Sequence, residues 1–168
     1  GRTSFKVYLP AKKISDISNS VQADAMVPRG NGETILVVDD EVIIREVAQL
    51  ILESNGYKVL LADYGPAALA AFARQMSQID VVITDLAMPL MNGLLLVRTL
   101  RQMQPAVKII ISTGHAEDWQ AAEMAHLNVD CFLTKPYTTR NLLIKPSHVL
   151  NGTLQAAALL DPSRRKQK

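Results

Sequence analysis

The chain has 168 residues, of which 48% are hydrophobic and 5% aromatic, and it carries a formal net charge of +2. This length suits one globular domain with tails, and so small a charge gives no basis for expecting nucleic acid or a membrane as a partner. Cys131 is the single cysteine, which excludes an internal disulfide and fits a reducing compartment. No apolar stretch could cross a bilayer and no signal-peptide pattern opens the chain, so we expect a cytoplasmic segment.

The two ends of the chain differ in character from its middle. Residues 1–10 predict a turn followed by a short strand, Phe5–Leu9, which Pro10 stops. Residues 11–33 are rich in Ser, Asn, Asp, Gly and Pro and show no apolar period, which is typical of a linker. Apolar runs alternate with amphipathic stretches through residues 34–152, which we take as the folded domain. Residues 153–168 end in a basic run that predicts a solvated tail.

Within the folded domain, short apolar runs predict strands at residues 34–38, 57–62, 79–84, 107–112 and 129–134. A helix is predicted after each strand. The first closes at Asn55-Gly56, which tolerate a positive φ, the second begins at Gly65-Pro66, and the others cover 94–103, 116–127 and 139–150. Pro146 falls inside the last helix, where a proline costs roughly 3 kcal/mol outside the first turn. We therefore expect this helix to kink or to start late.

Strands that alternate with helices and read as solid apolar runs predict an α/β fold, in which helices cover both faces of a parallel sheet. In such a sheet the functional site lies at the carboxyl ends of the strands. Polar residues collect at these predicted ends: Asp39, Asp40 and Glu41 after the first strand, Asp85 after the third, Ser112-Thr113-Gly114 at the fourth, and Thr134-Lys135-Pro136 at the fifth. A parallel sheet would bring these groups to one edge.

These residue types suit one kind of chemistry. Crowded carboxylates repel one another and need a cation, and all-oxygen ligands suit Mg²⁺, with Mn²⁺ as the alternative. Lys135 supplies a positive charge for a phosphoryl oxygen, and Thr113 supplies a hydroxyl donor. Together they predict phosphoryl transfer to a carboxylate, with Asp85 as the nucleophile.

Each of these residues also has a plainer interpretation. An acidic pair such as Asp39-Asp40 often only begins a helix, and an aspartate before a loop, such as Asp85, is often a turn residue. Lys135 can be an ordinary loop lysine, and Thr113 can be a helix cap. Their occurrence together, in order, at successive strand ends favours the functional interpretation.

Four motifs carry a family resemblance: TILVVDDE at the first strand, ITDLAMPLMNG around Asp85, IIISTGHAE around Thr113 and FLTKPY around Lys135. On these motifs residues 34–152 resemble a bacterial response-regulator receiver domain. The resemblance implies a flavodoxin-like (βα)5 three-layer sandwich with strand order 2-1-3-4-5. It also implies a phosphoacceptor in a two-component phosphorelay, which takes a phosphoryl group from phosphohistidine and switches conformation.

The resemblance further implies roles for individual residues. Asp85 is similar to the family's phosphoacceptor, which also contacts the metal. Asp39 and Asp40 resemble the metal-binding acidic pair, with Asp40 as the direct ligand. The backbone carbonyl of Ala87 would be a further metal ligand.

On the other side of the site, the resemblance implies residues that bind and report the phosphoryl group. Thr113 resembles the switch hydroxyl, and Lys135 resembles the invariant lysine, with a cis peptide bond to Pro136. Phe132 occupies the switch-aromatic position, although a plain core side chain is an equal interpretation.

The first ten residues, GRTSFKVYLP, resemble the last strand of a histidine-kinase ATP-binding domain. The chain would then be the C-terminal part of a hybrid histidine kinase, whose parent can be membrane-anchored. The isolated domain would be no enzyme beyond its own aspartyl phosphorylation and dephosphorylation. The implied partner is a histidine kinase or a histidine phosphotransfer domain. The family also suggests a homodimer through the fourth strand, the fifth strand and the last helix.

Two other functions fit parts of the pattern. A Mg²⁺-dependent phosphatase of the haloacid-dehalogenase type would have an Asp-x-Asp nucleophile motif at the first strand, where this chain has adjacent aspartates, Asp39-Asp40. A receiver-like module that only docks a partner would need no phosphorylation. Turnover of a phosphomonoester would indicate the first, and a folded protein inert to phosphodonors the second.

Overall fold

A computed structural model describes residues 27–114 and 129–152 of the chain. These residues form a five-stranded parallel sheet in the order β2-β1-β3-β4-β5, which confirms the predicted flavodoxin-like topology. The strands are β1 (Thr34–Val38), β2 (Lys58–Ala62), β3 (Ile79–Asp85), β4 (Lys108–Thr113) and β5 (Cys131–Thr134). The strand predicted at residues 5–9, the helix predicted at 116–127 and the tail from 153 lie outside the described residues.

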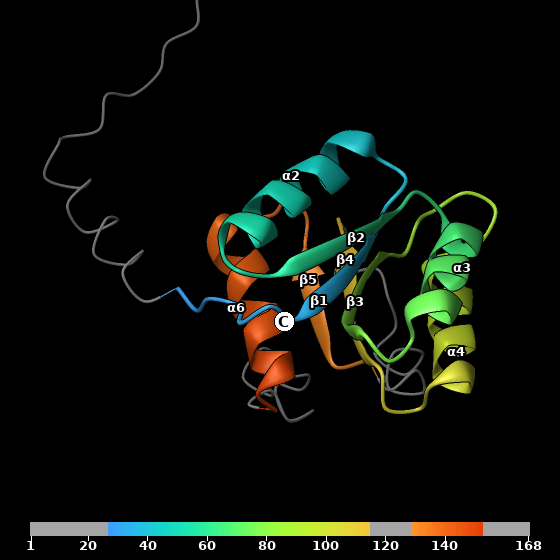
Figure 1. Ribbon diagram of the computed structural model, residues 1–168. Helices are drawn as coiled ribbons and strands as arrows, with labels where there is room; N and C mark the ends of the chain where they lie inside the picture. The colour runs from blue at the N-terminus through green and yellow to red at the C-terminus, as the bar shows by residue number, and fades with distance from the viewer. Residues whose placement is uncertain (1–26, 115–128, 153–168) are drawn as a thin grey trace, which may run out of the picture.

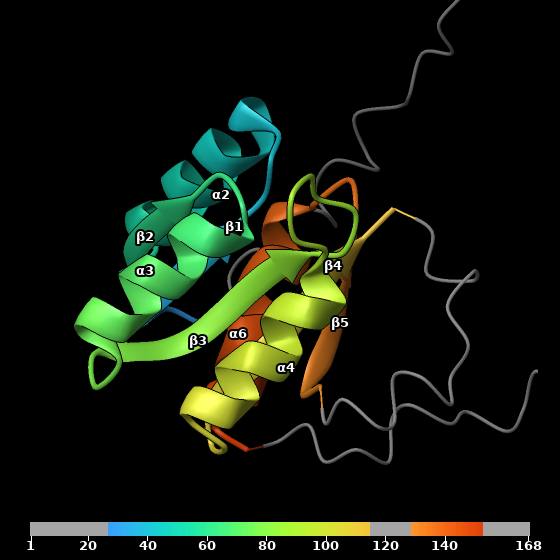
Figure 2. The ribbon, with the colours of Figure 1, turned by 90° about the vertical axis from the view of Figure 1, so that its right-hand side faces the viewer.

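Two layers of helices enclose the sheet. The helices are α2 (Val42–Ser54), α3 (Gly65–Gln75), α4 (Gly93–Met103) and α6 (Thr139–Leu150). Helices α2 and α6 cover one face, and α3 and α4 cover the other (Figure 1). Figure 2 shows α3 and α4 in front of the sheet, with α6 behind it. Among the described helices, none combines the length and apolar character that a bilayer span requires.

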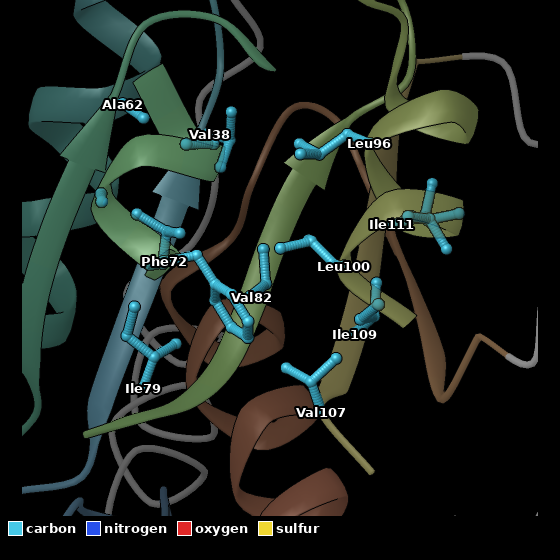
Figure 3. Close-up of a cluster of buried hydrophobic side chains, with 14 of the residues drawn as sticks. Val38, Ala62, Phe72, Ile79, Val82, Leu96, Leu100, Val107, Ile109 and Ile111 are labelled. Carbon is cyan, nitrogen blue, oxygen red and sulfur yellow. The ribbon is translucent and has the colours of Figure 1, made fainter. Parts of the chain in front are cut away.

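Each face of the sheet has its own core, because successive side chains of a strand point to opposite faces. In β1, Leu36 and Val38 join the cluster under α3 and α4, while Ile35 and Val37 join the cluster under α2 and α6. Figure 3 shows the first cluster, in which Phe72 lies beside residues from the sheet and from α4. Central strands buried on both faces explain why the sequence shows solid apolar runs there.

Polar caps fix where two of the helices begin. The Asn92 side chain accepts a hydrogen bond from the Leu95 amide at 2.9 Å, and the Thr138 hydroxyl accepts one from the Asn141 amide at 3.1 Å. Such caps satisfy amides that have no partner in the first turn. The cap at Thr138 makes α6 begin at Thr139, which confirms the predicted range of 139–150, and of the two expected effects of Pro146 a late start does not occur. Pro146 lies inside α6 and is buried, at a position where a proline cannot donate the usual helical hydrogen bond.

The end of the predicted linker lies on the domain. The amides of Gly30 and Gly32 donate to the carbonyls of Asn55 and Gly56, both at 2.9 Å. Gly56 has a φ of +91°, as its predicted place at the end of the first helix requires. A Cβ on Gly30 would meet the Tyr57 ring at 2.6 Å, so a larger residue there would have to displace the buried ring. Residues 30–32 therefore cap the turn between α2 and β2.

A substitution in the β3–α4 loop is expected to stabilise the fold. Leu90 has a φ of +67° and a side chain that is 84% exposed. A left-handed conformation costs a residue with a Cβ about 1–2 kcal/mol, and asparagine tolerates it better. We expect Leu90→Asn to raise the free energy of unfolding by about 1 kcal/mol, measured by urea denaturation. Leu50→Asn is the control, because Leu50 is 69% exposed in a regular helix; an equal gain there would contradict the explanation.

Candidate functional site

The predicted polar strand ends meet at one edge of the sheet. Asp85 ends β3 and pairs with Ser112 of β4, and Thr113 pairs with Thr134 of β5. Asp39 directly follows β1, the neighbour of β3. The predicted strands ended one residue earlier, at 84 and 112. In the structure Asp85 and Thr113 are themselves the last residues of β3 and β4, because backbone pairing continues through a polar residue. The parallel register thus gathers side chains from four strands.

Three carboxylates form the centre of this edge. Carboxylate oxygens of Asp39, Asp40 and Asp85 all lie within 4.8 Å of one another. Asp39 is 0% exposed and Asp85 is 7% exposed, while Asp40 faces solvent. Backbone amides hold the two buried carboxylates: the Glu41 amide donates to Asp39 Oδ1 at 3.0 Å, and the Leu86 amide donates to Asp85 Oδ1 at 2.7 Å. Clustered oxygen ligands with one exposed member fit a hard divalent cation that keeps several waters.

Lys135 links the two buried carboxylates. Its Nζ lies 2.7 Å from Asp39 Oδ2 and donates a hydrogen bond to Asp85 Oδ2 at 2.9 Å. Burial alone would lower the pKa of Lys135, but the two carboxylates outweigh burial and raise that pKa above its ordinary value. Lys135 therefore stays charged. The Glu41 carboxylate lies 3.9 Å away and is 66% exposed, so it contributes little.

The peptide bond between Lys135 and Pro136 is cis, as the resemblance implied. The loop it belongs to is fixed to β4, because the Lys135 amide donates to the Thr113 carbonyl at 2.9 Å. The backbone of the lysine and the end of β4 are thereby held side by side.

The ionisation of Asp39 opposes folding when no metal is bound. Burial raises the pKa of the Asp39 carboxyl above its ordinary 3.8, against the opposing effects of Lys135 and the Glu41 amide. A raised folded-state pKa gives a stabilising contribution that is complete below the unfolded pKa and is lost as pH rises through the folded pKa. We therefore expect Asp39→Asn to gain stability relative to the original chain as pH rises from about 4 towards neutral.

This expectation is tested by urea denaturation of both proteins in chelator at several pH values. Asp63→Asn is the control, because Asp63 also follows a strand but is exposed. A stability difference between Asp39→Asn and the original chain that does not change with pH would contradict the assignment.

The remaining predicted residues lie close to this centre. Thr113 is buried at the end of β4. Phe132 is partly buried and packs against the core under α3 and α4, which agrees with its interpretation as a core side chain and does not test a switch role. Ala87 is exposed, and its amide lies 3.4 Å from Asp85 Oδ1. The structure thus brings the predicted residues together, while their chemical roles stay predictions.

Sequence reasoning missed two supporting contacts. Arg45 Nη1 donates to the Asp39 carbonyl at 2.5 Å from the first turn of α2, and the Tyr137 and Ser112 hydroxyls are hydrogen-bonded at 2.7 Å. The only signals were an arginine near the start of the helix and a tyrosine two residues past the lysine. Neither spacing indicates its partner.

A family model described as "Response regulator receiver domain" matches residues 35–145. The transcriptional regulatory protein AruR of Pseudomonas aeruginosa is 33% identical over 143 residues, which are 83% of this chain and 56% of that protein. The sensor kinase CckA of Brucella abortus is 31% identical over 147 residues, again 83% of this chain but 16% of that protein. The chain thus spans about half or less of the length of these curated relatives.

Solved structures of response regulators are also similar to this chain. A response regulator receiver domain protein of Clostridium thermocellum superposes with a TM-score of 0.67 at 33% identity, covering 71% of this chain and 95% of that one. The chemotaxis protein CheY4 of Vibrio cholerae also superposes with a TM-score of 0.67, at 29% identity, covering 71% of this chain and 99% of that one. Fold, strand-end residues and family model agree, so the chain belongs to the response-regulator receiver family of two-component signalling systems.

Proposed function

We propose that this domain accepts a phosphoryl group on Asp85 from a phosphohistidine and changes conformation in response. One observation supports this most strongly. Lys135 Nζ contacts both Asp85 and Asp39, in a cluster of three carboxylates that needs further positive charge. A lysine and a cation next to one nearly buried carboxylate suit transfer of an anionic group to that carboxylate.

The transfer requires few groups. An Asp85 carboxylate oxygen attacks phosphorus, the bond between phosphorus and the histidine nitrogen breaks, and that nitrogen keeps the electron pair. Asp85 Oδ1 is held by the Leu86 amide, so the carboxylate is oriented before the donor arrives. The Lys135 ammonium can move its hydrogen bond from the carboxylate to a phosphoryl oxygen. Asp39, Asp40, Asp85 and the Ala87 carbonyl would hold Mg²⁺ or Mn²⁺, which offsets charge on the phosphoryl oxygens.

We propose Thr113 and Phe132 as the residues that report phosphorylation. Thr113 ends β4 beside Thr134 and Lys135, and its hydroxyl would donate to the phosphoryl group. Phe132 of β5 is the register partner of Ile111 of β4. Thr113 is two residues past Ile111, so all three side chains lie on the same face of the sheet. A hydrogen bond that forms only in the phosphorylated state would shift the population of two conformations of this face.

Receiver domains interact with histidine kinases or with phosphotransfer proteins. We propose that residues 1–10 are the end of a kinase ATP-binding domain, 11–33 a linker, 34–152 the receiver and 153–168 a tail, in a cytoplasmic part of a hybrid kinase. The similarity to a sensor kinase supports this arrangement. Other relatives are transcriptional regulators, so a proposed lack of nucleic-acid contact concerns this segment alone. A homodimer through β4, β5 and α6 is also a proposal.

The proposed function is tested by intact-protein mass after incubation with acetyl phosphate and Mg²⁺. We expect one added phosphoryl group, which disappears in Asp85→Asn and when a chelator removes the metal. Asp63→Asn is the matched control, because Asp63 follows β2 as Asp39 follows β1 but lies outside the carboxylate cluster. Failure of the folded original chain to gain mass from acetyl phosphate or from a phosphohistidine donor would favour a module that only docks a partner.

A further inference from the structure

The loop between β5 and α6 is attached to β4 at two points. The Lys135 amide donates to the Thr113 carbonyl at 2.9 Å, and the Tyr137 hydroxyl lies 2.7 Å from Ser112 Oγ, where either hydroxyl can be the donor. Ser112 is 0% exposed, so the tyrosine satisfies a hydroxyl that water does not reach. Tyr137 therefore makes the second attachment through its side chain.

Ser112 is placed next to the phosphoacceptor. It is the register partner of Asp85, and residues in register on parallel strands point to the same face of the sheet. That face is the one under α2 and α6, and Tyr137 packs against its core. Strands β4 and β5 are parallel neighbours in the sheet. The Tyr137 hydroxyl thus reaches from the loop that carries Lys135 to the residue beside Asp85.

Tyr137 lies near the charged groups of the site, but its phenol is itself uncharged. Burial raises the pKa of Tyr137 to about 12; the Ser112 hydrogen bond opposes this, and the Asp39 carboxylate adds to it. The phenol therefore keeps its proton at neutral pH.

We propose that Tyr137 is a positioning residue for phosphorylation: through Ser112, its hydroxyl holds the β5–α6 loop so that Lys135 Nζ lies against Asp85. This inference rests on the proposed function, and Tyr137 acts only through Lys135. The lysine has a flexible four-carbon side chain, so the position of its ammonium depends on how well its backbone is held. The amide of Lys135 and the side chain of Tyr137 hold the loop on both sides of Pro136.

The test compares Tyr137→Phe, which removes one oxygen atom, with the original chain. We expect the maximal rate of phosphorylation by acetyl phosphate to fall on the order of 10-fold, less than the roughly 100-fold that a 1 Å misplacement can cost. The half-saturating acetyl phosphate concentration should not change. Ser112→Ala removes the same hydrogen bond from the other side and should give a similar loss. Tyr64→Phe, just before α3, is the control.

A second comparison separates positioning from general loosening of the fold. In a Lys135→Ala background, Tyr137→Phe should lower the rate no further, because the group it positions is gone. Amide hydrogen exchange of Lys135 in metal-free protein, measured by NMR, should be about 10-fold faster in Tyr137→Phe, as loss of one hydrogen bond predicts.

The outcomes are distinct. If the original chain is not phosphorylated, the proposed function fails. If it is phosphorylated and Tyr137→Phe and Ser112→Ala keep its rate, the inference is overturned while the function stands. An equal loss from Tyr137→Phe in the Lys135→Ala background also overturns it, because the tyrosine would then act without the lysine. Unchanged exchange at the Lys135 amide would likewise contradict a role in holding the loop.

Discussion

Lys135→Ala is expected to slow phosphorylation of Asp85 by acetyl phosphate on the order of 100-fold, the size of loss that follows removal of one donor to a developing negative charge. Lys135 Nζ lies within 2.9 Å of carboxylate oxygens from both Asp39 and Asp85. Without Lys135, the anionic phosphoryl group approaches the buried Asp39 and Asp85 carboxylates with one positive charge fewer to offset the repulsion. The rate is measured by intact mass over time at saturating Mg²⁺.

The matched control for this variant is Lys58→Ala. Lys58 begins β2 and is exposed, at the opposite end of the sheet from the carboxylates. It loses the same positive charge without touching the site, so its rate should be unchanged. Equal rates for Lys135→Ala and the original chain would contradict the role given to the lysine.

Gly93→Ala is expected to lower the free energy of unfolding by about 3 kcal/mol, the upper range for forcing an extra carbon into a packed position. A Cβ at Gly93 would overlap the backbone carbonyl oxygen of Asp85 and lie 2.9 Å from the Leu86 Cα. Neither neighbour is a flexible side chain. The Gly93 amide also donates to the Leu86 carbonyl at 3.0 Å, so the clash cannot be relieved without moving the backbone of Asp85 and Leu86.

Gly114→Ala is the control for this effect, because no atom of residues 27–114 and 129–152 lies within 4 Å of a Cβ built there. Urea denaturation of both variants compares a crowded glycine with an uncrowded one. We expect Gly114→Ala to leave stability within about 1 kcal/mol of the original chain. Equal stability of Gly93→Ala and Gly114→Ala would contradict the close packing of the start of α4 against the end of β3.

Much of the fold could be predicted from the sequence because local signals agreed with the tertiary structure. Buried central strands read as solid apolar runs, and β1 was predicted with its observed bounds. Strand β5 is shorter than predicted: Val129 is apolar and buried, but it precedes the first paired residue, Cys131. Burial shows in a sequence, whereas the end of backbone pairing depends on the neighbouring strand.

The site could be predicted as far as strand ends determine it. Asp85 and Thr113 end their strands, and Asp39 and Lys135 directly follow theirs, so the order of the strands brings all four to one edge of the sheet. Asp63 also follows a strand but lies outside the carboxylate cluster, so a position directly after a strand does not by itself predict a site residue. The contacts of Tyr137 with Ser112 could not be predicted, since they depend on the path of a loop.

Locating the phosphoryl group on the chain tests the proposed role of Asp85 directly. Phosphorylated protein is reduced with borohydride, which converts an acyl phosphate to an alcohol, and is then cut at Lys and Arg for tandem mass spectrometry. Residues 75–98 form one fragment that holds Asp80 and Asp85, and residues 30–45 form another that holds Asp39 and Asp40. We expect reduction at Asp85 alone. Reduction at Asp39, Asp40 or Asp80, with Asp85 unchanged, would contradict the proposal that Asp85 accepts the phosphoryl group.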